Sequence, residues 1–333
     1  MSSKPSELTV PQQSRVVTMR QFGARTCFCA VALTIFSACD GSQTQQAGDT
    51  TTNGKPLLVT DSLRPAIGTG WEAAAGAFLI LPTVEGGHDA GSLLRPDAND
   101  STVGDTTGLP AKKDSDRLEL FSRAGLVGEA KFTIEKGAAV DSGCTAWPIA
   151  RLNAQTGTAP RGWTAAFVKG HITQVPLDSI EGLAPRDSAS LAANISRLAS
   201  GLSDDTVATF RGLRFVVLRA YRAKSGDKSF VVATLVRRVN QEDAPREERL
   251  VMVIDGEQAS PDLWTVGWHE RAAGREDELV VSEPLMAFQL QSGGRTHLLF
   301  GRDDGEALSA ALLVRDAKGW RVLWESALAG CEH

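Results

Sequence analysis

The chain is dominated by short stretches that have the composition of β-strands. Each stretch is rich in β-branched, aromatic or other apolar residues, and each is bounded by Gly, Pro, Asp or Ser, which favour turns. They lie at residues 77–83, 117–123, 130–135, 163–175, 213–222, 229–239, 249–255, 278–282, 296–301 and 311–315. Many short strands with frequent turns predict a mainly β protein, an antiparallel sandwich or meander in one large lobe or two smaller ones.

Two similar hairpins, in residues 250–270 and 311–326, are the most distinctive internal feature. Each reads as an apolar strand, an Asp-containing turn and a Trp-x-Val-x-Trp strand with an acidic residue after it. The copies lie 56 residues apart, which suits a duplicated β unit, although two copies are too few to indicate a propeller or solenoid. Because strand side chains alternate between faces, the two tryptophans and the valine of each motif should share one face.

The four tryptophans of these motifs allow two interpretations. They are Trp264, Trp268, Trp320 and Trp324. Exposed rings could form a platform for a glycan or peptidoglycan strand, since flat rings stack on sugar faces. Alternatively the rings belong to the core, where each large aromatic side chain buries about 150–250 Å². The apolar strands that precede both motifs favour the core.

One amphipathic helix is predicted near 187–202, within a segment 184–204 that separates a β lobe at 67–183 from a second at 205–333. Leu191, Ile195, Leu198 and Leu202 recur at helical spacing and form one apolar stripe. The helix could cover one face of a sheet or join the two lobes. In the first lobe, residues near 86–116 are polar and lack periodicity, which predicts a disordered loop.

The N-terminal region reads as a secretory signal, residues 1–38. Thirteen uncharged residues, 26–38, follow Arg20 and Arg25, and this run is too short to span a bilayer. Residues 36–39, Phe-Ser-Ala-Cys, resemble the lipobox of bacterial lipoproteins, except that Phe36 stands where that motif usually has leucine. The resemblance covers this segment alone, and Met19 is the better start of the signal.

The lipobox resemblance implies that Cys39 is acylated and becomes the mature N-terminus. Its partner would then be the lipid bilayer, and the protein would lie in the cell envelope, facing the periplasm or the exterior. Residues 39–66 are rich in Gly, Thr, Gln and Ser, which predicts a flexible tether between the anchor and the β domain.

Charge and motifs restrict the function classes. Residues 1–38 hold four basic residues and one acidic residue, so the remainder has 31 basic and 39 acidic residues, a net charge of −8. This balance argues against nucleic acid as a partner. The five histidines lack metal-ligand spacing, and no nucleophile elbow or phosphate-binding loop occurs. We therefore expect no cofactor or metal.

A basic stretch, residues 211–238, holds eight basic residues and one acid. Five of them, Arg214, Arg219, Arg222, Lys224 and Lys228, could face anionic lipid or glycan. The favoured interpretation is a solvated face whose charges pair across a neighbouring strand with the acidic residues that follow, Glu242, Asp243, Glu247 and Glu248.

Two functions remain open from the sequence. The favoured one is a non-catalytic envelope lipoprotein that binds an envelope protein or cell-wall polymer, or has a structural role. The alternative is a surface-tethered hydrolase acting on a cell-wall or extracellular polymer. A cleft that gathers a histidine with carboxylates would favour the hydrolase.

The cysteine count predicts one disulfide. Cys27 and Cys29 leave with the signal and Cys39 is acylated, so Cys144 and Cys331 remain. Two thiols in an oxidising compartment favour a bond between them, although two separate buried thiols are the alternative.

We expect the mature protein to migrate differently on reducing and non-reducing gels. Cys144→Ser and Cys331→Ser should each abolish the difference, because each removes one end of the same covalent loop. Two thiols that alkylate freely in native, oxidised protein would contradict the disulfide.

Overall fold

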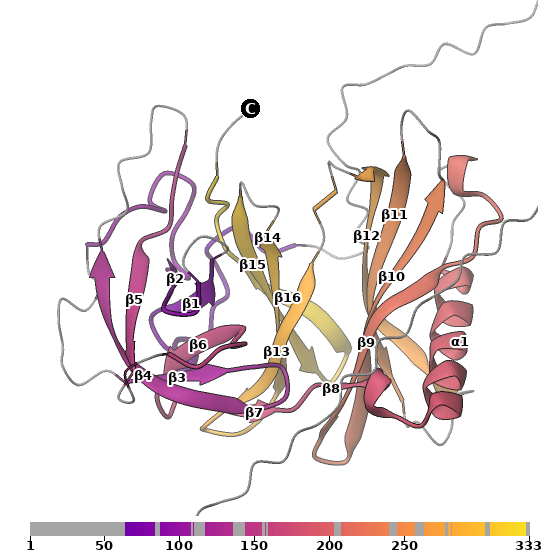
Figure 1. Ribbon diagram of the computed structural model, residues 1–333, viewed down its shortest axis with the longest axis horizontal. Helices are drawn as coiled ribbons and strands as arrows, with labels where there is room; N and C mark the ends of the chain where they lie inside the picture. The colour runs from indigo at the N-terminus through magenta and orange to yellow at the C-terminus, as the bar shows by residue number, and fades with distance from the viewer. Residues whose placement is uncertain are drawn as a thin grey trace, which may run out of the picture. The chain divides into compact units, whose positions relative to one another are not determined.

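The computed structural model describes residues 64–83, 87–107, 109, 117–135, 144–154, 157, 159–202, 208–239, 245–256, 263–276, 279–280, 282–303 and 307–330. All of them belong to one unit, Thr51–His333. The signal segment, Cys39, Cys331 and most of the tether lie outside the described residues. The described part is mainly β and antiparallel, as the sequence predicts (Figure 1).

The first strands close into a barrel in the order β1-β2-β5-β4-β3-β6. Their bounds are β1 Leu79–Pro82, β2 Ala90–Leu94, β3 Leu118–Phe121, β4 Leu126–Glu135, β5 Ile149–Ala154 and β6 Ala165–Val168. β6 closes the barrel, because it pairs with β1 at Ile80↔Ala166 and with β3 over four residues.

Alternation along the barrel strands divides their side chains between two cores. Ile80, Leu120 and Ala166 belong to the cluster inside the barrel. Their neighbours Leu81 and Phe167 belong to a different cluster, shared with the strands that follow the barrel. One wall of the barrel is therefore apolar on both sides, and its outer side is covered by a sheet.

The remaining strands form two five-stranded sheets with the same order. The first sheet is β12-β11-β10-β9-β8 and the second is β16-β15-β14-β13-β7. Their bounds are β7 Ile172–Val175, β8 Asp178–Ser179, β9 Val216–Ser225, β10 Lys228–Val239, β11 Arg246–Asp255, β12 Thr265–Arg275, β13 Glu283–Leu290, β14 Thr296–Asp303, β15 Leu308–Asp316 and β16 Gly319–Glu325. Each sheet is a four-stranded meander with one short strand added at its edge.

The two meanders also share the strands that carry their irregularities. The register of the β9–β10 pair skips Leu218, and that of the β13–β14 pair skips Leu285. Each copy also carries a bulge in its last strand, at Gly267 in β12 and at Leu323 in β16. The duplicated unit predicted from the two hairpins therefore extends over four strands.

These last bulges overturn the predicted face of the second tryptophan in each Trp-x-Val-x-Trp motif. Trp264 packs in the cluster beneath the helix, whereas Trp268 faces the second sheet. In the second copy Trp320 faces the first sheet, and Trp324 faces the barrel. An extra residue in a strand shifts the following side chains to the other face, so simple alternation fails here.

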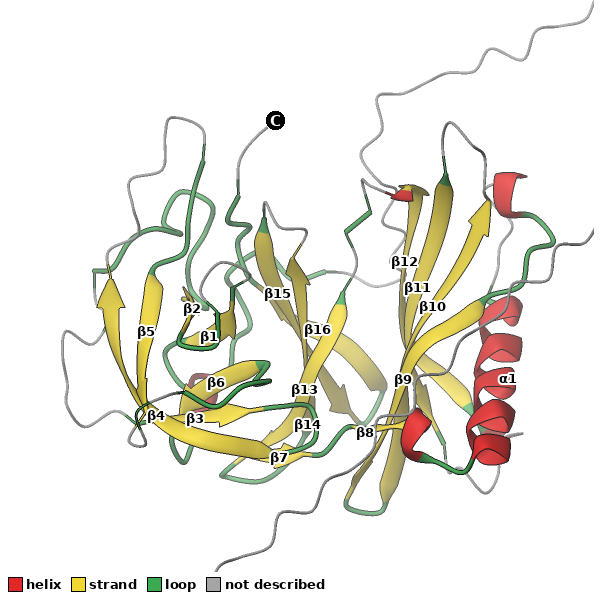
Figure 2. Ribbon diagram, in the orientation of Figure 1, coloured by secondary structure: helices red, strands yellow, loops and turns green. Residues whose placement is uncertain are grey.

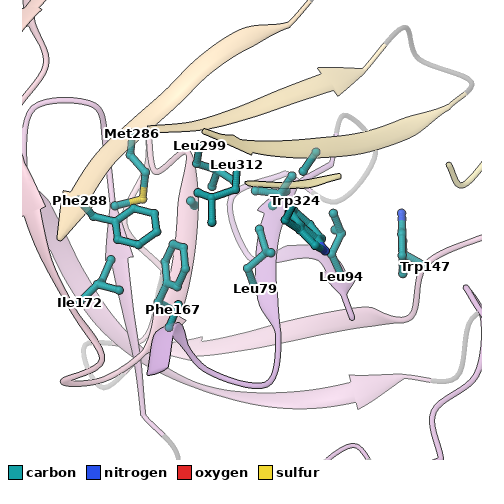
Figure 3. Close-up of a cluster of buried hydrophobic side chains, with 14 of the residues drawn as sticks. Leu79, Leu94, Trp147, Phe167, Ile172, Met286, Phe288, Leu299, Leu312 and Trp324 are labelled. Atoms are coloured by element: carbon teal, nitrogen blue, oxygen red, sulfur yellow. The ribbon is translucent and has the colours of Figure 1, made fainter. Parts of the chain in front are cut away.

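All four tryptophans are buried, in agreement with the core interpretation. Trp324 is 0% exposed and the other three are 6% exposed. Trp324 packs edge-on against Trp71, and its indole N–H donates to the Pro96 carbonyl over 2.7 Å. The platform interpretation is wrong for these rings, because none leaves a face open to a ligand. Figure 3 shows Trp324 within the cluster between the barrel and the second sheet.

The two sheets stack face to back. We call the face of each sheet that carries the second tryptophan of its motif, Trp268 or Trp324, the front. Trp268 contacts the second sheet, whereas Trp324 faces the barrel. The front of the first sheet therefore packs on the back of the second. Gly267 permits this contact, because a Cβ there would lie 2.7 Å from the Trp320 ring.

Helix α1, Pro185–Gly201, confirms the predicted helix and covers the remaining face of the first sheet (Figure 2). Leu191, Ile195 and Ala199 are its buried residues, with Leu198 and Leu202 partly buried against the same cluster. Pro185 occupies the first turn, where its missing N–H costs no helical hydrogen bond. The helix therefore covers one face of a sheet, which is the first of the two roles predicted for it, and does not join two lobes.

Three 3₁₀ turns complete the described elements: η1 Ala73–Ala75, η2 Ile180–Gly182 and η3 Ala208–Phe210. β7 and β8 lie within the predicted N-terminal lobe but pair with the two later sheets. The boundary predicted near residue 183 is therefore not the boundary between barrel and sheets.

The predicted disordered loop near 86–116 contains a buried strand. β2 supplies part of the barrel, and all five of its residues are buried. Its composition, Ala-Gly-Ser-Leu-Leu, hides it, because the small residues weaken the strand signal. Gly91 is needed here, since a Cβ would lie 2.5 Å from the Leu81 carbonyl oxygen. Residues 86, 108 and 110–116 of this loop lie outside the described part.

We expect Trp268→Ala and Trp324→Ala each to lower the free energy of unfolding by about 3–5 kcal/mol, because each removes a large buried ring. Leu263→Ala is the matched control, since Leu263 is 75% exposed and should change stability by less than about 0.5 kcal/mol. Urea and thermal unfolding measure all three. Unchanged midpoints for the tryptophan variants would contradict the core assignment.

Candidate functional site

A pocket of about 550 Å³ lies where the first sheet, the second sheet and the barrel meet. We call it the junction pocket. It is lined by Leu81, Pro82, Thr83, Leu218, Arg219, Thr234, Arg249, Leu279, Val280, Ser282, Glu283, Leu285, Gly301, Asp303 and Leu308. These residues come from the end of β1, from β9, β10 and β11, and from the end of the second sheet where β13 begins and β14 ends.

The matched bulges of the two meanders place a leucine in this pocket from each sheet. Leu218 and Leu285 are the residues skipped by the strand registers, and both line the junction pocket. A bulge turns a side chain away from the regular alternation of its strand. Gly301 leaves room for Leu285, because a Cβ at position 301 would lie 2.9 Å from a terminal carbon of the Leu285 side chain.

Leu279 and Val280 form another wall of the pocket, although the sequence predicts that they belong to a strand. Residues 278–282 are predicted as a strand, but β13 begins only at Glu283. Leu279, Val280 and Ser282 lie in the segment before it, outside any strand, and line the pocket instead. Length and apolar composition alone do not distinguish a short strand from such a segment.

The charged side chains of the described lining are two arginines, Arg219 and Arg249, and two carboxylates, Glu283 and Asp303. Glu283 accepts from both Arg123 and Arg219, each over 2.6 Å. Arg249 lies 2.8 Å from Glu247, and Arg238 contacts the same carboxylate. Each arginine of the lining therefore shares a carboxylate with a second arginine that lies outside the lining.

A buried ionic cluster lies beneath the pocket, between the two sheets. Ser282 donates to both carboxylate oxygens of Glu270, over 3.0 and 3.2 Å, and accepts from Arg302 over 2.9 Å. Arg302 also pairs with Glu270 and lies 3.6 Å from Glu325. Arg64 reaches both carboxylates, Glu270 over 3.5 Å and Glu325 over 3.2 Å.

The cluster balances two arginines against two glutamates in a site where Glu270 is 3% exposed. Buried charges persist only when they are paired, and removing one partner is strongly destabilising. The cluster therefore holds Ser282, and with it the segment that lines the pocket, in a fixed position. An apolar chamber over a rigid polar floor can bind a ligand that has an apolar body and a charged end.

Two arginines of the basic stretch pair with the acidic residues that follow it. Arg237 lies opposite Glu248 in the register and bonds to it over 2.8 Å, and Arg238 contacts Glu247. Arg219, one of the five residues expected on the solvated face, pairs with Glu283 instead. Arg237 is buried, at 3% exposed, and lies over the Phe215 ring at 4.9 Å. Arg271 adds a second contact to Glu248, over 3.1 Å.

The four described histidines are not among the described residues that line the junction pocket. His171 contacts the Ala74 carbonyl, His88 lies beside Asp89, and His269 lies opposite Met252 within the first sheet. His297 is buried, stacks on Phe288 and places its Nε2 3.1 Å from Glu72. His333 lies outside the described residues. Within the described ranges, no group of three or more His, Cys, Asp or Glu side chains is placed to hold a metal ion.

Of the cysteines, only Cys144 lies in the described part, where it is disulfide-bonded. Its chain neighbour Thr145 donates its N–H to the Gly330 carbonyl over 2.9 Å. Cys39 and Cys331 fall outside the described residues.

The junction pocket itself is missed by sequence reasoning, because its residues are spread from Leu81 to Leu308. One signal was present in the sequence. Leu218 is followed by Arg-Ala-Tyr and Leu285 by Met-Ala-Phe, so an alignment of the two meanders would have paired these leucines. Their departure from strand alternation could not be read from that alignment.

Comparison with known proteins identifies no relative. No family model, no curated protein and no solved structure matches this chain.

Burial lowers the pKa of His297, and the hydrogen bond that Glu72 accepts from the ring only partly opposes this effect. The unfolded chain, in which the pKa lies near 6.5, therefore binds protons more readily than the folded protein. Stability from neutral His297 is present above pH 6.5 and is lost as the pH falls below that value.

We expect His297→Phe and His297→Gln both to flatten the loss of stability between pH 7 and pH 5. Each unit of lowered pKa corresponds to about 1.4 kcal/mol, so urea unfolding at several pH values can resolve the effect. Phenylalanine is the residue at the equivalent position of the first sheet, Phe230, which makes it a suitable replacement. An acid slope equal to that of the wild type in both variants would contradict this assignment.

Proposed function

We propose that this chain is a membrane-anchored lipoprotein of the bacterial cell envelope whose β domain is a non-catalytic binding module. Acylated Cys39 attaches it to a membrane, and residues 40–63 separate the anchor from the domain. Several buried acyl chains, at about 0.8 kcal/mol for each methylene, suffice for stable attachment. Among the described residues, no helix is both long and apolar enough to cross a membrane.

The observation that supports the binding module is the junction pocket. Its volume of about 550 Å³ falls within the range of ligand sites, roughly 300–1,000 Å³. The described part of its lining includes Ser282, Glu283 and Asp303 and no histidine, whereas the hydrolase alternative expects a histidine gathered with carboxylates. Its charged floor is internally paired, which favours holding a ligand in place.

A disulfide between Cys144 and Cys331 belongs to the same proposal. Cys144 is disulfide-bonded, and the hydrogen bond from Thr145 to Gly330 brings the residues beside both cysteines together. Such a bond would tie the segment after β16 to the segment that precedes β5 of the barrel. The segment after β16 is also held by the second sheet, because Ala329 bridges to Leu308 at the start of β15.

Lipidation is tested by metabolic labelling with a radioactive or clickable fatty acid in the bacterial host. We expect label on the wild-type protein and none on Cys39→Ala, which should remain uncleaved or become soluble because its acyl acceptor is gone. Cys29→Ala is the matched control, since this cysteine lies within the signal and its loss should leave labelling intact. A wild-type protein that never acquires label would contradict the anchor.

A further inference from the structure

The walls of the junction pocket are aliphatic. Six side chains supply them: Leu81, Leu218, Leu279, Val280, Leu285 and Leu308. The described lining contains no aromatic ring, although the chain has seven tryptophans and twelve phenylalanines. Ligands with flat rings or sugar faces are commonly held by stacking on aromatic side chains. Aliphatic walls instead suit a flexible hydrocarbon chain.

Two arginines of the lining can hold a negatively charged group. Glu283 is shared by Arg123 and Arg219, and Glu247 is shared by Arg249 and Arg238. A guanidinium has five N–H donors in a planar fork, so each of these arginines retains donors beyond its contact with a shared carboxylate. Arg219 and Arg249 both line the pocket, so their remaining donors can bind one carboxylate there.

We propose that the junction pocket binds a fatty acid in its carboxylate form. The hydrocarbon chain lies between Leu218 and Leu285, the two bulge leucines, and the carboxylate is held by Arg219 and Arg249. This inference rests on the proposed function, whose binding site is this pocket. It adds the ligand class: one aliphatic chain with one negative charge.

Calorimetric titration of the domain with laurate tests the proposal. Residues 51–333 form one unit that contains all four hydrophobic clusters, so this fragment carries its own core. We expect one laurate to bind each domain, and octanoate to bind at least tenfold more weakly, because each methylene contributes up to about 0.8 kcal/mol. Dodecyltrimethylammonium, with the same chain and the opposite charge, should bind at least tenfold more weakly than laurate.

Substitutions of pocket residues test where on the domain laurate binds. Leu218→Gln should weaken laurate binding about tenfold, because it makes one wall polar. Val216→Gln is the matched control on the same strand, since Val216 is 61% exposed and lies outside the pocket. Arg219→Gln should weaken laurate about three- to tenfold and leave dodecanol unchanged. Arg151→Gln, which removes an exposed ion pair of the barrel, should change neither.

Several outcomes would contradict the assignment of a fatty acid as the ligand. These are no laurate binding, equal binding of the ammonium compound, or equal losses in Leu218→Gln and Val216→Gln. Native mass spectrometry of the domain purified from its host shows whether the ligand class alone is wrong or the proposed binding function is wrong as well. A retained molecule of another class, such as a lysophospholipid or a peptide, would contradict only the fatty acid as ligand. A domain that retains nothing and binds no laurate would overturn the binding module as well, whereas labelling of Cys39 concerns only the anchor.

Discussion

The packing of one meander on the other is the contact on which the rest of the structure depends. Trp268 of the first sheet meets Phe300 of the second at 5.5 Å between ring centroids, and Trp320 of the second meets Phe230 of the first at 5.1 Å. Asp255 accepts from the Trp320 indole over 2.9 Å. Because the copies stack face to back, the pair leaves two unlike apolar faces. The barrel covers one and α1 covers the other, as terminal caps do in repeat proteins.

The same stacking determines where a ligand can enter. The space between the sheets is apolar around Trp268 and Trp320, and it becomes ionic toward Glu270 and Arg302. Buried ion pairs add little net stability compared with apolar packing, but removing one partner is strongly destabilising, so the charges at this end of the sheets stay paired. The junction pocket opens beside this ionic end, and the matched bulges direct a leucine into it from each sheet. Duplication of one unit therefore supplies both the scaffold and two walls of the site.

Local patterns predicted the local elements of this fold. The stripe of Leu191 and Ile195 predicted α1, and the apolar strands beside the Trp motifs predicted a buried rather than an exposed set of rings. Features that depend on partners distant in sequence were not predictable. Gly267 and Leu323 look like ordinary strand residues, yet as bulges they send Trp268 and Trp324 to the opposite face from Trp264 and Trp320. β2 was missed because Gly91 and Ser92 carry no strand signal, and only the closed barrel explains them.

A crystal structure of the domain with a bromine-labelled fatty acid would locate the bound ligand, because bromine scatters anomalously and marks its own position. With bromine at the end of the hydrocarbon chain, we expect an anomalous peak between Leu218 and Leu285, with the carboxylate near Arg219 and Arg249. A peak only at the outer surface, or inside the barrel among the residues around Ile80 and Leu120, would contradict this placement.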